Sequence, residues 1–192
     1  MAVREIVTVG DPVLRERARE VTPAQLRSPE VQRLIDDLID TKRAADGAGI
    51  AANQIGETLR VAIVEVEPGN PRYPYKPAVP LTVIVNPRIE PLGTETAEIN
   101  EGCLSVPGLR GTVDRHMRVR VRYLDREGIE HVEERGGLTA GTFQHEADHL
   151  DGILFLDRVR DPTTFSTWEQ FDRHHRAAFE AHARAIVERL GS

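Results

Sequence analysis

The residues best suited to chemistry lie in one short stretch, Gln144 to Gly152, which reads QHEADHLDG. His145 and His149 are four residues apart, so on a helix their side chains would project from one face, one turn apart. Two imidazoles placed in this way can bind one divalent cation, and Glu146 beside them can accept a proton from a water molecule at the metal. The pattern favours a metal site over the alternative of two histidines that are merely solvated or hydrogen-bonded.

A tetrahedral site built on two histidines needs at least one more protein ligand. The only cysteine of the chain, Cys103, is a candidate because a thiolate binds divalent metals strongly, although a lone cysteine is most often a small buried hydrophobe. The carboxylate ligand of a typical HExxH protease should lie downstream of His149, and the acidic residues there stand at no recognised spacing: Asp157, Asp161, Glu169 and Asp172. Cys103 is therefore the more economical third ligand.

A glycine-rich stretch, GAGIAANQIG at 47–56, formally matches the dinucleotide fingerprint G-x-G-x-x-A. That fingerprint must follow a strand, whereas this stretch follows a helical pattern, and no Lys-Ser/Thr pair follows to make a phosphate loop. A tight turn remains, where the backbone approaches something closely. The amide of Gln54 is either an exposed polar group or a donor aimed at a developing oxyanion.

The element that must position the histidines is expected to be a helix that ends at Gly152. The first 22 residues are expected to form an irregular arm, and a helix is predicted over 23–45. A long amphipathic helix is predicted over 162–190, because Asp161-Pro162 can begin it and Ser166 and Glu169 have capping-box spacing. Strands are predicted at 59–66, 81–85, 94–106, 113–124 and 131–134. Strands interrupted by a few helices, without regular alternation, favour an α+β fold.

Between the first two strands, prolines at 68, 71, 74, 77 and 80 recur every third residue, the period of a polyproline II helix. A stiff connection between the strands is favoured over a ligand for a proline-binding partner, since such compositional signals are weak.

Composition restricts the classes of function. The 192 residues suit one domain over 1–192, and 40% hydrophobic with 29% charged residues is ordinary for a globular protein. A net charge of −6 provides no general attraction to nucleic acid or to an anionic membrane. One cysteine excludes an intrachain disulfide and fits a reducing cytosol. With no apolar run near the roughly 18 residues of a membrane span and no signal-like start, the expected location is the cytoplasm.

Three ordered motifs together resemble the peptide deformylase family: GAGIAANQ at 47–54, EGCLS at 101–105 and QHEADH at 144–149. The resemblance extends from Gly10 to Leu156. It implies an α+β fold with antiparallel sheets around a central metal-binding helix, plus an N-terminal and a C-terminal helix. It also implies hydrolysis of the formyl group from N-formylmethionyl nascent peptides, with release of formate, as in bacterial protein maturation.

The resemblance further implies roles for individual residues. Cys103, His145 and His149 would bind one divalent ion, Fe(II) in the cell, with zinc, nickel and cobalt also able to occupy such sites. Glu146 would be the general base and acid, and Gln54 and the Leu104 N–H would stabilise the oxyanion. Gly49 would contact the substrate, and Arg110 matches a basic position that follows the family's cysteine motif.

Four features depart from the family pattern. Gly141, one turn before His145, replaces a bulky aliphatic and is expected to widen the pocket for the first side chain of the substrate. Asp114 replaces a proline. The 67–80 segment is longer than in simple members, and the aromatic tail is this chain's own, so the ribosome docking known for some members is not carried over.

Two other functions stay open at this point. One is a HExxH metallopeptidase, and the other is a catalytically idle binding module stabilised by a metal. The intact Glu146 and Gln54 speak against idleness, because neither is needed to hold a metal.

Overall fold

The computed structural model describes residues 2–70 and 72–191, so Met1, Pro71 and Ser192 lie outside the description below. The irregular arm predicted for the N-terminus is present and contains one short 3-10 helix, η1 (Pro12–Arg15). Its backbone is tied to the middle of the chain, because the Val7 N–H donates to Gln54 O and the Val9 N–H to Ser105 O, at 2.9 and 2.7 Å.

The helix predicted over 23–45 is two helices, α1 (Pro23–Leu26) and α2 (Pro29–Ala44). The break has a local cause. Proline lacks an N–H and disfavours a helical conformation at the residue before it. Ser28 is therefore extended, and its hydroxyl accepts from the Val31 N–H as the cap of α2.

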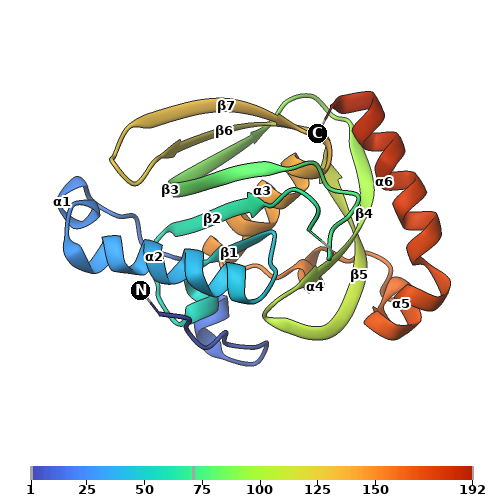
Figure 1. Cartoon of the computed structure of the whole chain (residues 1–192), viewed down its shortest axis with the longest axis horizontal. Helices are drawn as coiled ribbons and strands as arrows, with labels where there is room; N and C mark the ends of the chain where they lie inside the picture. The colour runs from blue at the N-terminus through green and yellow to red at the C-terminus, as the bar shows by residue number, and fades with distance from the viewer. Residues whose placement is uncertain (1, 71, 192) are drawn as a thin grey trace.

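A five-stranded antiparallel sheet runs in the order β1-β2-β3-β6-β7 (Figure 1). Its strands are β1 (Gly49–Ala51), β2 (Val61–Val66), β3 (Val79–Pro91), β6 (Arg118–Leu124) and β7 (Glu130–Gly136). In β6 the valines and tyrosine at 119, 121 and 123 are buried and the arginines at 118, 120 and 122 are exposed, as their alternation predicts.

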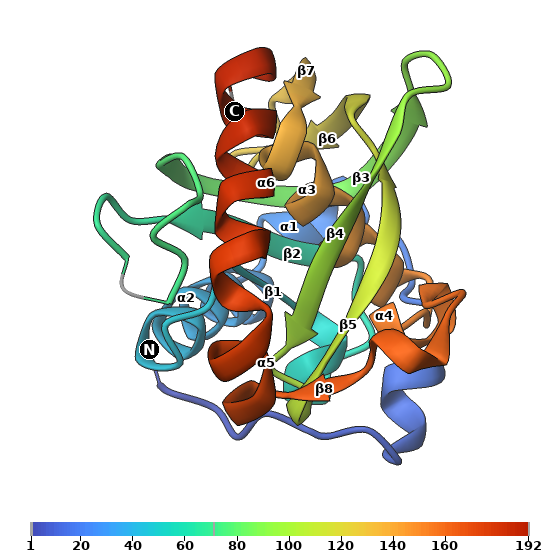
Figure 2. The same cartoon turned by 90° about the vertical axis from the view of Figure 1, so that its right-hand side faces the viewer.

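At β2 both faces of this sheet are covered, which explains why every residue of that strand is buried. Val61 and Ile63 pack with α2, whereas Ala62 and Val64 point to the other face and pack with α3 (Gly137–Leu150). A three-stranded sheet, β4 (Thr96–Cys103), β5 (Val106–His116) and β8 (Ser166–Thr167), lies on the far side of α3 (Figures 1 and 2).

The helix that carries the histidines is therefore central, and 11 of its 14 residues are buried. It ends as predicted, since Gly152 two residues later has the left-handed φ of +74°. The antiparallel sheets around this helix confirm the expected α+β fold.

The prediction of one helix over 162–190 is wrong. After α4 (Phe155–Arg158) the chain forms a 3-10 turn η3 (Pro162–Thr164), then β8, α5 (Trp168–His174) and α6 (Arg176–Leu190). Asp161 and Pro162 do begin a helical turn, but Ser166 and Thr167 pair with β5, and Thr167 caps α5 in place of the Ser166–Glu169 box. Strand pairing with β5 thus overrides the local helical pattern. Figure 2 shows α6 standing beside β4, and Ala183 and Ile186 of α6 pack with Ile99 of β4.

The 67–80 segment does connect two strands, but it is not a polyproline II helix. The N–H groups of Asn70, Tyr73 and Lys76 donate to the carbonyls of Glu67, Asn70 and Tyr73, at 3.0–3.2 Å. A polyproline II helix has no internal hydrogen bonds, so the described part of this segment is a series of turns.

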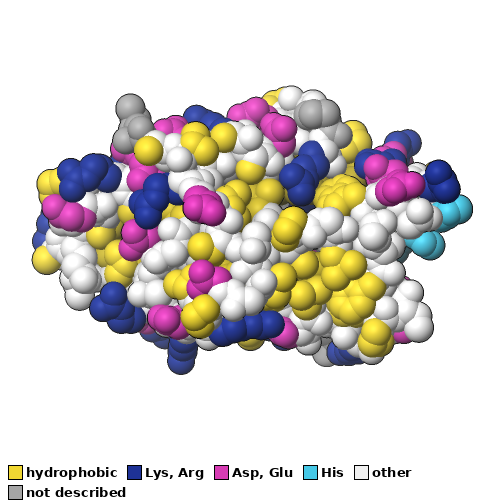
Figure 3. Space-filling model, turned by 90° about the horizontal axis from the view of Figure 1, so that it is seen from below, with side chains coloured by type: hydrophobic (Ala, Val, Ile, Leu, Met, Phe, Trp, Pro, Cys, Tyr) yellow, Lys and Arg dark blue, Asp and Glu magenta, His cyan; other side chains and the backbone are white. Residues whose placement is uncertain are grey.

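The surface is mixed in charge. Basic and acidic side chains intersperse with apolar ones over the face seen in Figure 3, in keeping with the small net charge. Within residues 2–70 and 72–191, no helix has both the length and the hydropathy that crossing a bilayer requires.

The packing of α5 predicts how strongly the C-terminal helices are held. Phe171 is buried at 1% exposure, and its ring lies 4.3 Å from the Arg110 guanidinium carbon. Phe171→Ala should lower the free energy of unfolding by about 3–5 kcal/mol through the lost burial and the cavity left behind. The exposed neighbour Gln170 is the control, and Gln170→Ala should change it by less than about 0.5 kcal/mol. Urea denaturation measures both, and equal effects would contradict this account of the packing.

Candidate metal centre and active site

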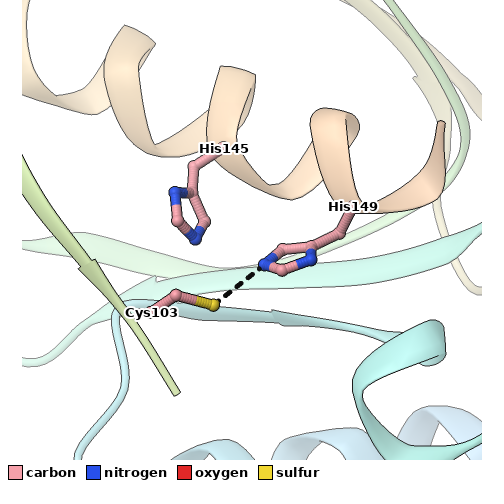
Figure 4. A group of neighbouring side chains, drawn as sticks. All are labelled: Cys103, His145 and His149. Atoms are coloured by element: carbon pink, nitrogen blue, oxygen red, sulfur yellow. Dashed lines mark hydrogen bonds between the residues drawn. The ribbon is translucent and has the colours of Figure 1, made fainter. Parts of the chain in front are cut away.

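Cys103, His145 and His149 converge at one point between α3 and β4. The two histidines project from successive turns of α3 toward the thiol at the end of β4 (Figure 4). Their ligand atoms all lie within 4.8 Å of one another, and Cys103 Sγ is 3.2 Å from His149 Nε2. In a tetrahedral site the metal–sulfur distance is about 2.3 Å and the metal–nitrogen distance about 2.0–2.1 Å, so ligand atoms stand roughly 3.5 Å apart. A thiolate and two imidazoles in this arrangement fit a divalent metal.

The thiol of Cys103 also receives hydrogen bonds from its surroundings. The Ser105 N–H and the Gln54 side-chain amide both donate to Cys103 Sγ, at 3.4 and 3.5 Å. Such outer hydrogen bonds orient a ligand and stabilise its anion. The His149 ring is fully buried, and its Nδ1 has no hydrogen-bond partner among the described residues.

A chain of buried ion pairs supports His145. Its Nδ1 lies 2.9 Å from Glu101 Oε2, and Glu101 receives two hydrogen bonds from the Arg115 guanidinium at 2.8 and 2.9 Å. Arg115 also donates to Asp148 at 2.6 Å, and Asp148 is bound in turn by Arg158. A carboxylate on the second ring nitrogen fixes the tautomer and orientation of a metal-binding histidine.

Sequence reasoning did not assign Glu101 or Arg115. A signal for Glu101 was available, because residues two apart in a strand point to the same face, so Glu101 had to lie beside Cys103. Arg115 offered no such signal, since its partners come from β4 and α3 and meet it only in the folded chain.

These contacts shift the pKa values of the buried groups at the site. Burial raises the pKa of Glu101, but the Arg115 guanidinium outweighs it and holds that pKa well below its usual range. Burial lowers the pKa of His145, yet hydrogen bonds to Cys103 and Glu101 raise it well above normal. Burial and the neighbouring His145 lower the pKa of His149. A metal at this site would need both imidazoles in the neutral form, so binding releases a proton wherever a ring is protonated.

Glu146 is placed beside the metal ligands and is not one of them. It is buried, and its Oε2 has no hydrogen-bond partner among the described residues. Burial raises its pKa to about 7, a value suited to taking and returning a proton near neutral pH. Its carboxylate lies directly against Gly49, so closely that any Cβ on residue 49 would collide with it. This close approach is what the glycine-rich turn provides.

Gln54 is buried at 2% exposure, which excludes the exposed alternative. Its Oε1 accepts from the Ala51 N–H at 2.9 Å, which turns its amide nitrogen toward Cys103 and Ser105, with Nε2 3.1 Å from Ser105 Oγ. Leu104 follows Cys103 in the turn between β4 and β5.

One cavity connects these groups. Of the nine residues singled out in the sequence, His149 is buried and does not line the cavity. The other eight line it: Gly49, Gln54, Cys103, Leu104, Arg110, Gly141, His145 and Glu146. A Cβ on Gly141 would stand 3.0 Å from Ile99 Cδ1, so the space left by the missing side chain is taken up in part by Ile99.

Arg110 is engaged within the protein. It donates to Asn100 Oδ1 at 2.7 Å, and its guanidinium carbon lies 4.1 Å from the centre of the Trp168 ring. It is buried at 1% exposure, and burial lowers its pKa. The cavity is completed by residues that the sequence did not indicate: Tyr73, Tyr75 and Lys76 from the 67–80 segment, and Phe179 from α6.

Gly49→Ala tests the contact between the turn and Glu146. The new methyl group must push the Glu146 carboxylate away, so turnover should fall at least about tenfold, as displaced catalytic groups lose rate steeply. Metal content should stay unchanged because no ligand touches Gly49. Activity and metal analysis on the same preparation decide it, and full activity would mean that Glu146 acts from another position.

Comparison with known proteins agrees with the site. The family model described as polypeptide deformylase matches residues 3–165. A peptide deformylase from Leptospira biflexa is 41% identical over 172 residues, which cover 90% of this chain and 96% of that protein. A peptide deformylase from Heliobacterium modesticaldum is 48% identical over 161 residues, 84% of this chain and 97% of that protein.

Solved structures show the same likeness. A class I type b peptide deformylase from Acinetobacter baumannii, with Met-Ala-Ser bound, superposes with a TM-score of 0.79 at 39% identity, over 82% of this chain and 99% of that chain. A peptide deformylase from Legionella pneumophila covers 98% of this chain and 95% of its own, with a TM-score of 0.72 at 34% identity. The chain therefore belongs to the peptide deformylases, the metal-dependent hydrolases that remove the N-formyl group from nascent peptides.

Proposed function

We propose that this deformylase acts on N-formylmethionyl ends with one divalent ion held by Cys103, His145 and His149, and with Glu146 as the group that moves protons. The observation that supports this most strongly is the convergence of a thiol and two imidazoles beside a buried carboxylate that binds none of them. A divalent ion bound there would act as a Lewis acid and lower the pKa of a water molecule.

Glu146 has two tasks in this proposal. Its carboxylate accepts a proton from the attacking water, and the resulting acid returns that proton to the leaving amine. A pKa of about 7 suits both directions, because neither form is strongly disfavoured near neutral pH. Formate and a free amino terminus are the products.

Gln54 and the Leu104 N–H are the proposed donors to the oxyanion that develops on the formyl oxygen. The support for Gln54 is its fixed orientation, with the amide oxygen held by Ala51 N–H and the nitrogen turned toward Cys103. Its amide hydrogens point to Cys103 Sγ and Ser105 Oγ in the structure, so one of them would be redirected to the oxyanion while the amide oxygen stays bound to Ala51.

The cavity beside α3 is the proposed pocket for the first side chain. Its free volume is about 60 Å³, room for about four groups of water size at 10–15 Å³ each. A methionine side chain has four heavy atoms. Gly141 and Arg110 line this cavity and Gly49 its entrance beside Glu146, and we assign substrate contacts to these three residues on that basis.

Fe(II) is the proposed native metal, with zinc, nickel and cobalt as substitutes, and the cytoplasm is the proposed compartment. A single thiol among the metal ligands fits a reducing environment. The metallopeptidase alternative has less support, because the third ligand candidate is a thiol upstream of the histidines, whereas Asp157 pairs with Arg15 and lies outside the cluster.

The ligand assignment predicts that Cys103→Ala loses tight metal binding, since it removes one of three protein donors. Metal analysis after anaerobic purification with Fe(II) measures this, with His149→Ala as a second ligand variant and wild type as reference. Stoichiometric metal and full activity in Cys103→Ala would show that another residue is the third ligand.

The proton-transfer role predicts that Glu146→Gln keeps the metal but releases formate from a formyl-Met tripeptide about 10²–10⁴-fold more slowly. The exposed Glu134 provides a matched control, because Glu134→Gln removes the same charge far from the site and should leave the rate unchanged. A Glu146→Gln enzyme that works at the wild-type rate would contradict the mechanism.

A further inference from the structure

Lys76 is a charged residue in the cavity lining for which the proposed mechanism has no use. It comes from the turns of the 67–80 segment and lines the cavity together with Gly141 and Thr142 of α3. Its Nζ donates to Thr142 Oγ1 at 2.7 Å and lies 5.1 Å from the centre of the Tyr73 ring.

The ammonium is incompletely satisfied. It has three hydrogens to donate, and the described residues supply one acceptor and no ion-pair partner within 4 Å. The Thr142 hydroxyl gives its own proton to Leu138 O, so it serves Lys76 only as an acceptor. The chain's other lysine, the fully buried Lys42, behaves differently, since its Nζ is paired with Glu65 at 2.6 Å.

Lys76 is half-buried, and polar groups withdrawn from water in proteins are nearly always hydrogen-bonded. Here the open donors belong to the cavity that the proposed function assigns to the first side chain of the substrate. The missing acceptor can therefore arrive with that side chain.

The chemistry of the acceptor is restricted by its surroundings. Charges of both signs act on Lys76: the guanidinium groups of Arg110 and Arg115, and the carboxylates of Glu101 and Glu146, which line the same cavity. A third anion in the same cavity would be repelled by these two carboxylates, whereas a neutral oxygen with a strong dipole would not. Apolar walls from Leu138, Ile99 and Phe179 line the same cavity, so the side chain should be apolar along its length and polar at its end.

We propose that Lys76 is a specificity-determining residue that donates a hydrogen bond to a neutral acceptor at the end of the substrate's first side chain. The chemical class that fits is a formyl peptide whose first residue is methionine sulfoxide or glutamine. The proposal rests on the deformylase function and on the first-side-chain pocket described above. Its consequence is that oxidised formylmethionine stays a substrate, where a fully apolar pocket would reject it.

The test compares kcat/KM for formate release from four tripeptides of the form formyl-X-Ala-Ser. X is methionine, norleucine, methionine sulfoxide or glutamine, and the two sulfoxide epimers are assayed separately. The variant is Lys76→Met, which keeps an unbranched chain of similar length and removes the donor. The ratio of the sulfoxide to the norleucine peptide should fall about 10- to 100-fold for at least one epimer, the range for a hydrogen bond to a charged group.

Two further variants locate the effect. Thr142→Val removes the acceptor that positions the ammonium, so it should lower the same ratio by a smaller factor. Arg72→Met removes a cation from the same segment whose guanidinium lies 5.1 Å from the Trp168 ring centre, and it should leave the ratio unchanged. Melting temperature and metal content confirm that each variant is folded and loaded.

The outcomes separate this proposal from the one on which it rests. Wild type that fails on formyl-Met-Ala-Ser overturns the deformylase activity itself. Wild type that works, with a sulfoxide-to-norleucine ratio that is the same in Lys76→Met, overturns the specificity role. A uniform loss on all four peptides also overturns it, because Lys76 would then act on the catalytic groups and not on the side chain.

Discussion

The buried guanidinium of Arg115 joins the two parts of the metal site. Cys103 is on β4 and both histidines are on α3, and Arg115 of β5 binds Glu101 two residues before the thiol and Asp148 next to His149. Three charged groups at such depth are costly unless each is paired, and removing one member of such a set leaves a buried charge. Arg115 thus holds α3 against β4 at the point where Cys103 and the two histidines meet. Glu101 Oε2, which also accepts from Arg115, contacts His145 Nδ1 and orients its ring.

The depth of α3 has a second consequence. A helix covered on both sides by sheets excludes water from the groups it carries, and it raises the pKa of Glu146 by the same burial that lowers the pKa of His149. One environment thus shifts the pKa values of a carboxyl and an imidazole about one helical turn apart, upward for Glu146 and downward for His149. The close contact with Gly49 completes this arrangement, because only a residue without a side chain lets the turn at 47–49 cover the carboxylate.

Part of the cavity wall comes from the 67–80 segment and the C-terminal helices. Tyr75 of the 67–80 segment meets Phe179 of α6 edge to face, with ring centres 5.0 Å apart, and Arg110 lies between Trp168 and Phe171 of α5. Aromatic and cation–π contacts of this kind hold surface segments in place at modest cost. The turns at 67–80 and the C-terminal helices thus form one cover over the cavity. Among the described residues, Lys76 is the only charged side chain of this cover that lines the cavity.

The sequence by itself determined the chemistry at the centre of this protein. The spacing of His145 and His149 on a helix, the single thiol at Cys103 and the three ordered motifs suffice to predict the cluster of these three side chains, the α+β class and the family, because helical periodicity and motif spacing are local properties. Glu101 could also have been found, from its place two residues before the thiol.

The features that only the tertiary structure determined depend on contacts between residues that are far apart in the sequence. Arg115 gains its role from β4 and α3 together, the pattern at 162–190 yields to pairing with β5, and the proline-spaced segment folds back over the cavity. In each case the local signal was weak or misleading, since burial, strand pairing and charge neutralisation depend on residues that meet only when the chain is folded.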